Sequence, residues 1–178
     1  MSKHDKAEEF YSLIEDIEIA MFTTRRADGR LVSRPMATQV RSEGADLWFV
    51  TDISTDKMDE LENDPHVNVA YYNTKSREYV SVSGNARVVN DRAKIREQYR
   101  PDWKAWFPGD DEKSGTPEDP RIALIAVDAD SAVYLKIDKP KPIVLFEVAR
   151  GMITGKTPDV GEVRRVSGRE LSGTGAGD

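Results

Sequence analysis

The chain carries a series of short segments with the alternating pattern of β-strands, and this series limits the folds that it can adopt. The clearest are LWFVTD (47–52), HVNVAYYN (66–73) and YVSVSGNARVV (79–89), separated by short connections. Strands that follow one another so closely pair as antiparallel neighbours, because a parallel pair needs a long crossover. We therefore predict a mostly β fold, a small antiparallel barrel with peripheral helices at its rim.

Further strands are expected on both sides of this series. IAMFTTRRADGRLVSRPMATQV (19–40) predicts two strands around a turn that carries Gly29. Pro35 places the second strand at an edge or bulge, because proline has no N–H for the ladder. SEGAD predicts a second hairpin turn into LWFVTD. RIALIAVDADSAVYLKID (121–138) and KPIVLFEVARGMITG (141–155) are expected to return as the strands that close the sheet.

Helices are expected around the barrel. The spacing of apolar residues predicts a helix over residues 5–17, DKMDELEND (56–64) predicts a short one, and Asp91 is a candidate N-cap for a third over 91–99. The stretch 100–120 is rich in proline and acidic residues and predicts a loop with a short helix.

The C-terminal residues differ in composition from the rest. From Gly155 onward the chain is rich in glycine and poor in large apolar residues, which predicts a flexible tail. The expected organisation is one barrel domain over residues 1–154 and a tail over 155–178.

Composition excludes several classes of function. The chain has no cysteine, which excludes disulfides, thiolate catalysis and cysteine-based zinc sites. Its two histidines, His4 and His66, do not stand at ligand spacing, so we expect no transition-metal site. The formal charge of −6 argues against a nucleic-acid or anionic-membrane surface. Without a signal-peptide pattern or a long apolar run, we expect a cytoplasmic protein.

The junction ISTDK (53–57) gathers polar side chains where a strand hands over to a helix. A helix start offers unpaired N–H groups and a positive dipole end. The hydroxyls of Ser54 and Thr55 and the charge of Lys57 would complete a phosphate cradle. Alternatively, Ser54, Thr55 or Asp56 caps the helix and Lys57 is solvated, which is the commoner use of such residues. This segment alone favours the cap.

The order of SRPM (33–36), LWFVTD, ISTDKMDELENDPHVNVAYYN and YVSVSGNARVV resembles the pyridoxamine-phosphate-oxidase-like flavin proteins with a split-barrel fold. The resemblance points in particular to their bacterial general stress protein branch and spans roughly residues 8 to 150. It implies an FMN cofactor bound at a homodimer interface.

The resemblance also implies a set of cofactor-binding residues. Arg34 and Lys57 would hold the flavin phosphate, within a clamp that includes Ser54, Thr55 and Asp56. The isoalloxazine and ribityl parts would be flanked by residues of two strands: Met36, Ala37, Thr38, Val50 and Thr51. Tyr79 stands where relatives place a glutamine that contacts the flavin. Apart from the resemblance, the Pro-rich loop carries the large aromatic residues Trp103, Trp106 and Phe107. They either cover the flavin face, which makes Trp106 a further candidate, or plug the barrel end, which is the commoner role of clustered aromatics.

Two departures argue against a true pyridoxamine phosphate oxidase. Gln39 replaces a substrate-binding lysine, and the absence of histidine after His66 rules out the C-terminal Arg-x-His motif. A flavin supplies the electron chemistry itself, so no catalytic residue can be named from the sequence. Three hypotheses remain: a flavin-dependent oxidoreductase of an unknown small molecule with a stress-related role, a non-enzymatic flavin-binding or flavin-buffering stress protein, and a relative that uses the deazaflavin F420.

Overall fold

A computed structural model of the chain describes residues 2–172. The helices are α1 (Lys3–Ile17), α2 (Lys57–Asn63), α3 (Arg92–Gln98), the 3₁₀-helix η1 (Pro101–Ala105), α4 (Lys141–Thr154) and α5 (Gly168–Ser172). The strands are β1 (Ile19–Arg25), β2 (Leu31–Ala37), β3 (Leu47–Asp52), β4 (His66–Tyr72), β5 (Tyr79–Val89), β6 (Ile122–Lys136) and β7 (Glu162–Ser167). None of the helices within residues 2–172 is long and apolar enough to cross a membrane.

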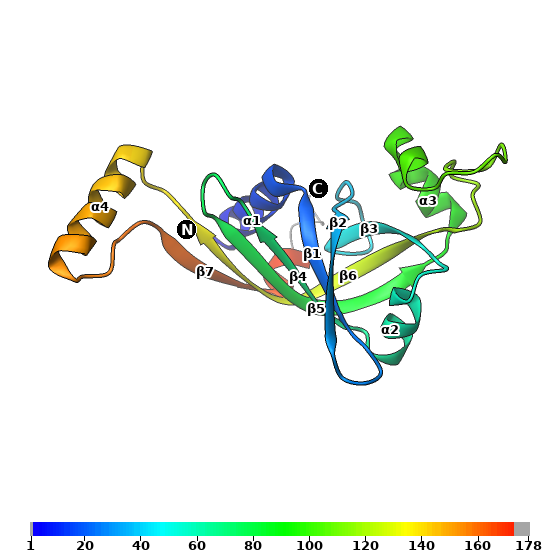
Figure 1. The fold of residues 1–178 in the computed structure, drawn as a ribbon, viewed down its shortest axis with the longest axis horizontal. Coiled ribbons are helices and arrows are strands. Elements are labelled where there is room, and N and C mark those ends of the chain that lie inside the picture. The colour runs from blue at the N-terminus through cyan, green and yellow to red at the C-terminus, as the bar shows by residue number, and fades with distance from the viewer. Residues whose placement is uncertain (1, 173–178) are drawn as a thin grey trace.

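The strands form one antiparallel sheet in the order β2-β1-β4-β5-β6-β3, and β7 adds to β6 (Figure 1). The sheet curls until Thr38, the residue after β2, forms a bridge with Phe49 of β3, so that the two end strands meet there. This confirms a mostly β split barrel. It also confirms the hairpin at Gly29, whose φ of 84° lies in the left-handed region that glycine enters without strain.

The second predicted hairpin is wrong. SEGAD does lead into β3, but β2 and β3 share only the Thr38–Phe49 bridge and a backbone hydrogen bond of 2.8 Å from Gln39 N to Trp48 O. β3 instead pairs with β6 over its whole length. Because Pro35 cannot donate to a ladder, β2 is poorly suited to a second strand partner, and the barrel stays open beyond the bridge.

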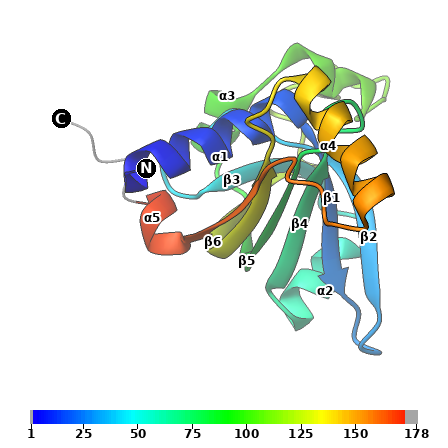
Figure 2. The ribbon, with the colours of Figure 1, turned by 90° about the vertical axis from the view of Figure 1, so that its left-hand side faces the viewer.

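The barrel interior is filled by alternate residues of the strands and by one face of α1, which lies across the barrel (Figure 2). Phe10 and Leu13 of α1 are buried with Phe22 and Phe49, whose rings meet edge to face at 5.1 Å. Burying the apolar stripe of α1 is what holds this helix in place, since an isolated helix of this length is marginal in water.

A second, smaller core lies between β3, β6 and the segment 91–107. Trp103 and Phe107 are buried there against Trp48, Ile95 and Ile122. The prediction of a loop with a short helix around Trp103 is confirmed by η1, and Asp91 caps α3 by accepting a hydrogen bond of 2.8 Å from Ala93 N.

Lys141–Thr154 form the helix α4, so the strand predicted over residues 141–155 is wrong. Pro140 and Pro142 cannot donate to a ladder, whereas the first turn of a helix tolerates proline because its N–H groups are unpaired anyway. Gly155 then ends α4 in the left-handed conformation, with φ at 69°. The apolar run therefore belongs to a helix at one end of the molecule, carried by the ends of β6 and β7 (Figure 1).

The prediction of a flexible tail from residue 155 is wrong for residues 162–172. β7 pairs with β6 from Ser131–Ser167 to Lys136–Glu162, and α5 follows it. Val166 and Leu171 are buried in the main core, and these two apolar residues are the local signal that the glycine-rich composition obscured. The remainder of the predicted tail, 173–178, lies outside the described residues.

Candidate functional site

The open side of the barrel begins where the two end strands separate. From the Thr38–Phe49 bridge, β2 runs back to Arg34 and β3 runs on to Asp52, and no ladder of the described residues joins the two strands along this stretch. α2 starts directly after β3 and packs against β1 and β5. The split therefore brings together residues of β2, the ISTDK junction and α2.

Arg34 lies at this split with its guanidinium held on two sides. Nη1 donates to Thr24 Oγ1 at 2.7 Å, and Nη2 donates to Glu60 Oε2 at 2.6 Å. The side chain is 25% exposed, so it is partly buried yet reaches a cavity of about 370 Å³ beside Asp56 and Asp59.

Lys57 is the second cation of the split. Its Nζ donates to Thr55 Oγ1 at 2.9 Å. Burial lowers the pKa of the Lys57 ammonium, and the nearby positive charge of Arg34 lowers that pKa further. The positive charges of these two partly buried side chains repel each other, so a bound anion between them would stabilise the site.

The hydroxyls of the junction are used locally. Ser54 donates to Asp52 Oδ1 through both its N–H and its hydroxyl, at 2.8 and 2.6 Å, and Thr55 Oγ1 donates to Asp52 O at 2.8 Å. Asp56 is the N-cap residue of α2 but makes no side-chain cap bond. The expectation of a side-chain cap at this helix start is wrong, because the turn is closed by Asp52 instead.

The remaining strand residues follow the split. Met36 is buried and Ala37 is half-buried on β2, while Thr38 bonds to the Tyr71 hydroxyl at 2.8 Å. On β3, Val50 packs against the second core, and Thr51 is buried with its hydroxyl donating to Asp52 O. The structure thus places these predicted residues on the two strands that border the opening.

Tyr79 and Trp106 lie elsewhere. Tyr79 pairs with Tyr72 and Leu135 on β5, and β1 and β4 separate it from β2. Trp106 follows η1 and is 78% exposed, in contrast to the buried Trp103. Within one chain neither side chain joins the cluster of Arg34 and Lys57.

Gln39 occupies a closed environment. Its Oε1 accepts a hydrogen bond of 3.0 Å from Trp103 Nε1, and its Nε2 donates to Ala37 O at 3.0 Å. The Gln39 side chain therefore connects the loop that carries Trp103 to the end of β2, and it is buried.

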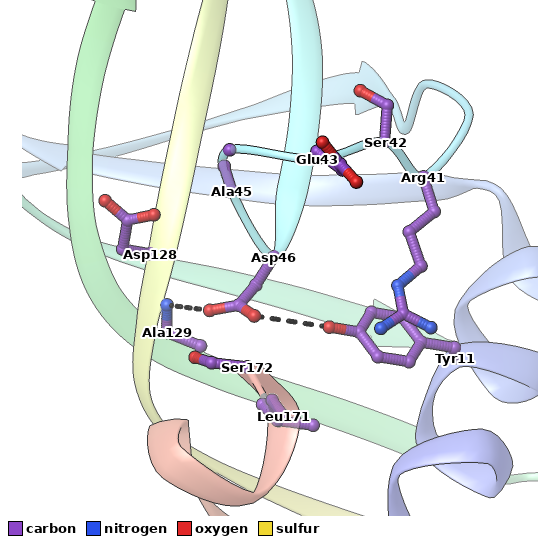
Figure 3. Close-up of a pocket in the computed structure, with 11 residues that line it drawn as sticks. Tyr11, Arg41, Ser42, Glu43, Ala45, Asp46, Asp128, Ala129, Leu171 and Ser172 are labelled. Carbon is purple, nitrogen blue, oxygen red and sulfur yellow. Dashed lines mark hydrogen bonds between the residues drawn. The ribbon is translucent and has the colours of Figure 1, made fainter. Parts of the chain in front are cut away.

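A second cavity, of about 620 Å³, lies beyond the C-terminal end of β2 (Figure 3). Asp46 accepts from Ala129 N at 2.8 Å and from the Tyr11 hydroxyl at 3.3 Å, and Arg41 stacks 3.8 Å from the Tyr11 ring centre. Burial raises the pKa of the Asp46 carboxyl. Ala129 adjoins the register shift between β5 and β6, so Asp46 satisfies an N–H next to a bulge, which is a structural role.

Sequence reasoning missed two residues of the split, Thr24 and Glu60. Both are buried, and Thr24 Oγ1 donates to Glu60 Oε2 at 2.6 Å. Glu60 stands three residues after Lys57, which puts both on one side of α2, and this spacing was the available signal. Within residues 2–172 there is no group of three or more His, Asp or Glu side chains able to hold a metal ion.

Comparison with known proteins places the chain in a family. The family model described as pyridoxamine 5'-phosphate oxidase like matches residues 5–159. The protein bli-3 of Neurospora crassa is 38% identical over 170 residues, which cover 93% of this chain and 81% of the relative.

Two solved structures show the same fold. A candidate general stress protein 26 from Jannaschia sp. CCS1 is 26% identical with a TM-score of 0.70, over 92% of this chain and 98% of its own. The general stress FMN/FAD binding protein of Xanthomonas citri is 26% identical with a TM-score of 0.59, over 72% of this chain and 86% of its own. The chain belongs to the pyridoxamine 5'-phosphate oxidase like family.

Proposed function

We propose that the chain binds FMN, with the flavin phosphate between Arg34 and Lys57. The observation that carries this proposal is the placement of two partly buried cations, from separate elements, at the opening of the split barrel. A phosphoryl group carries nearly two charges and suits the fork of an arginine beside the point charge of a lysine. The Xanthomonas citri relative is described as an FMN/FAD binding protein, which supports a flavin here.

The rest of the flavin would lie along the open strands. Met36, Ala37 and Thr38 would flank the ring from β2, and Val50 and Thr51 would border it from β3. When bound, the flavin supplies the electron-transfer chemistry, and the chain supplies binding, orientation and exclusion of water. We propose that the chain is a cytoplasmic, stress-related oxidoreductase that uses the flavin to act on a small molecule. We propose that it does not act as a pyridoxamine phosphate oxidase, because Gln39 is buried and neutral.

We also propose that the protein is a homodimer. The outer face, formed by Ile19, Met21, Tyr72, Tyr79 and Val163, is partly exposed across β1, β4, β5 and β7. α4 exposes a second set of large apolar side chains, Ile143, Leu145, Phe146, Val148, Met152 and Ile153. Exposed apolar surface of this extent on a folded chain marks an interface, and a second copy would cover both surfaces by twofold symmetry.

An absorption spectrum of the purified protein, with mass spectrometry of the released cofactor, tests the proposal. FMN is expected. A bound deazaflavin would favour the F420 alternative, and failure to retain or take up any flavin would contradict the proposal. Oxidation of a reduced nicotinamide with electron acceptors then separates an oxidoreductase from a flavin-buffering protein, which would show no turnover.

A further inference from the structure

Three side chains from three elements form a closed hydrogen-bonded triangle at the split. Thr24 of β1, Arg34 of β2 and Glu60 of α2 contact one another at 2.6 to 2.7 Å. Thr24 accepts from Arg34 and donates to Glu60, so its hydroxyl is used in both directions. Each member is thus held by the other two.

Two members of the triangle are shielded from water, while Arg34 is 25% exposed. Thr24 is fully buried and Glu60 is 6% exposed. A buried carboxylate is costly unless it is paired and hydrogen-bonded, and Arg34 and Thr24 supply the ion pair and the hydrogen bonds of Glu60. The three contacts therefore depend on one another and fix the orientation of the guanidinium.

This arrangement leaves donors for a ligand. A guanidinium has five N–H groups, and the two bonds of the triangle use two of them. Glu60 lies in α2, about one turn after Lys57. Its carboxylate therefore holds Arg34 beside the second cation. Without such an anchor, a long arginine side chain next to a like charge would turn toward water.

We propose that Glu60 and Thr24 are positioning residues, which hold Arg34 in the orientation that binds the phosphate of the flavin together with Lys57. The inference rests on the proposed binding of FMN and identifies what selects FMN over riboflavin. Both residues act through Arg34, whose fixed orientation removes the entropy that a mobile arginine would lose on binding.

Two variants that keep the charge of the site test this role. Glu60→Asp withdraws the carboxylate by one methylene, and Thr24→Val removes the hydroxyl at nearly constant volume. Because the net charge is unchanged, a change in phosphate affinity reports the position of Arg34. Thr23→Val is the matched control, since the neighbouring Thr23 bonds to Ser33 at 2.6 Å on the other face of β1.

The affinities of flavin-free protein for FMN and for riboflavin are measured by flavin fluorescence, below the unfolding temperature of each variant. We expect Glu60→Asp and Thr24→Val to weaken FMN about tenfold and leave riboflavin within about twofold, and Thr23→Val to change neither. Equal loss for both flavins, or no loss, would overturn the inference and leave the triangle a purely structural contact. Wild-type protein without preference for FMN would instead overturn the proposed phosphate site.

Discussion

Charge at the split is decided by a few side chains that the fold brings together from distant parts of the sequence. The positive charge of Arg34 opposes the charged form of Lys57. Glu60 forms an ion pair with Arg34, and Asp52 accepts hydrogen bonds from the hydroxyls of the junction. The pKa of Lys57 is lowered chiefly by burial, so the free protein bears the cost of a desolvated ammonium. A bound phosphate would offset that cost, which is how such a site gains affinity.

Removal of the Lys57 ammonium should therefore affect FMN and riboflavin differently. In the proposed site, Lys57→Ala would delete one charge-assisted contact to the phosphate, so we expect FMN to bind about tenfold to a hundredfold more weakly, a loss on the order of 1.5–3 kcal/mol. Riboflavin, which lacks the phosphate, should bind as before. Fluorescence titration of both flavins measures the difference.

The exposed Lys75, in the turn between β4 and β5, provides the control. Lys75→Ala changes the net charge of the protein by the same amount and should leave both affinities unaltered. Equal losses for both flavins in Lys57→Ala would show that the lysine supports the fold. No loss for either would show that the phosphate does not bind at Lys57.

How far these residues could be foreseen depends on their separation in sequence. Ser54, Thr55 and Lys57 are neighbours, so their convergence follows from local geometry, and the sequence order of the strands suggested Arg34 through its resemblance to a family. Thr24 and Glu60 belong to the same cluster, but a threonine in a strand and an acid on a helix are common, and only the curl of the sheet brings them to Arg34.

Among the elements, strands with alternating apolar residues were predicted correctly because their own residues carry the pattern. The curl of the barrel was only partly predictable. β3 pairs with β6 rather than with its sequence neighbour β2, and the paired residues Trp48 and Ala126 are more than 70 positions apart. The segment of α4 was predicted as a strand because it is a short apolar run with β-branched and aromatic residues. Such a run fits a strand as well as a buried helix.

The carboxylate of Asp119 makes several of the contacts that hold the loop after η1. Asp119 accepts from Gly115 N at 2.8 Å and from Arg121 Nη2 at 2.7 Å, and Arg121 in turn donates to the carbonyl of Phe107 at 3.2 Å. The hydrogen bonds from the Arg121 guanidinium lower the pKa of Asp119 to about 2. This network fixes the segment that carries Trp103 and Phe107 over the second core.

Asp119→Asn should destabilise the protein in a pH-dependent way. Above about pH 5 the carboxyl is ionised in both the folded and the unfolded chain, so its contribution of about 2 kcal/mol is fully present. As pH falls from about 5 to about 2, the unfolded chain takes up the proton first and the contribution is progressively lost. Urea unfolding at pH 7 and at pH 3 should show the difference between wild type and variant shrinking.

Asp110→Asn, in the same loop and exposed, is the matched control and should change the free energy of unfolding little at either pH. A difference between wild type and Asp119→Asn that stays constant with pH would mean that the carboxylate acts through its shape alone. In that case its charge would not stabilise the loop.

At the scale of the whole molecule, the single chain leaves two apolar surfaces without cover. Met152 and Ile153 of α4 are 84% and 85% exposed, and the outer face exposes Tyr72 and Val163 to about half of their surface, at 52% and 55%. A stable dimer buries about 800 Å² on each partner, and the dimer proposal assigns the α4 side chains and the outer face to that interface. α4 stands at the far end of the molecule (Figure 1), where a second chain can reach it.

The dimer proposal predicts that charges on α4 separate the chains. Met152→Lys combined with Ile153→Lys places four ammonium groups in a twofold interface, which should cost on the order of 3 kcal/mol or more and weaken association at least a hundredfold. Light scattering at micromolar concentration should give twice the 20.0 kDa chain mass for wild type and the mass of one chain for the variant. Glu112 is exposed in the loop after η1 and provides the control. Glu112→Lys changes the net charge of each chain by the same +2, and this variant should remain dimeric. Wild-type protein with the mass of one chain would contradict the dimer, whereas a dimeric double variant would place the interface away from α4, on the outer face alone.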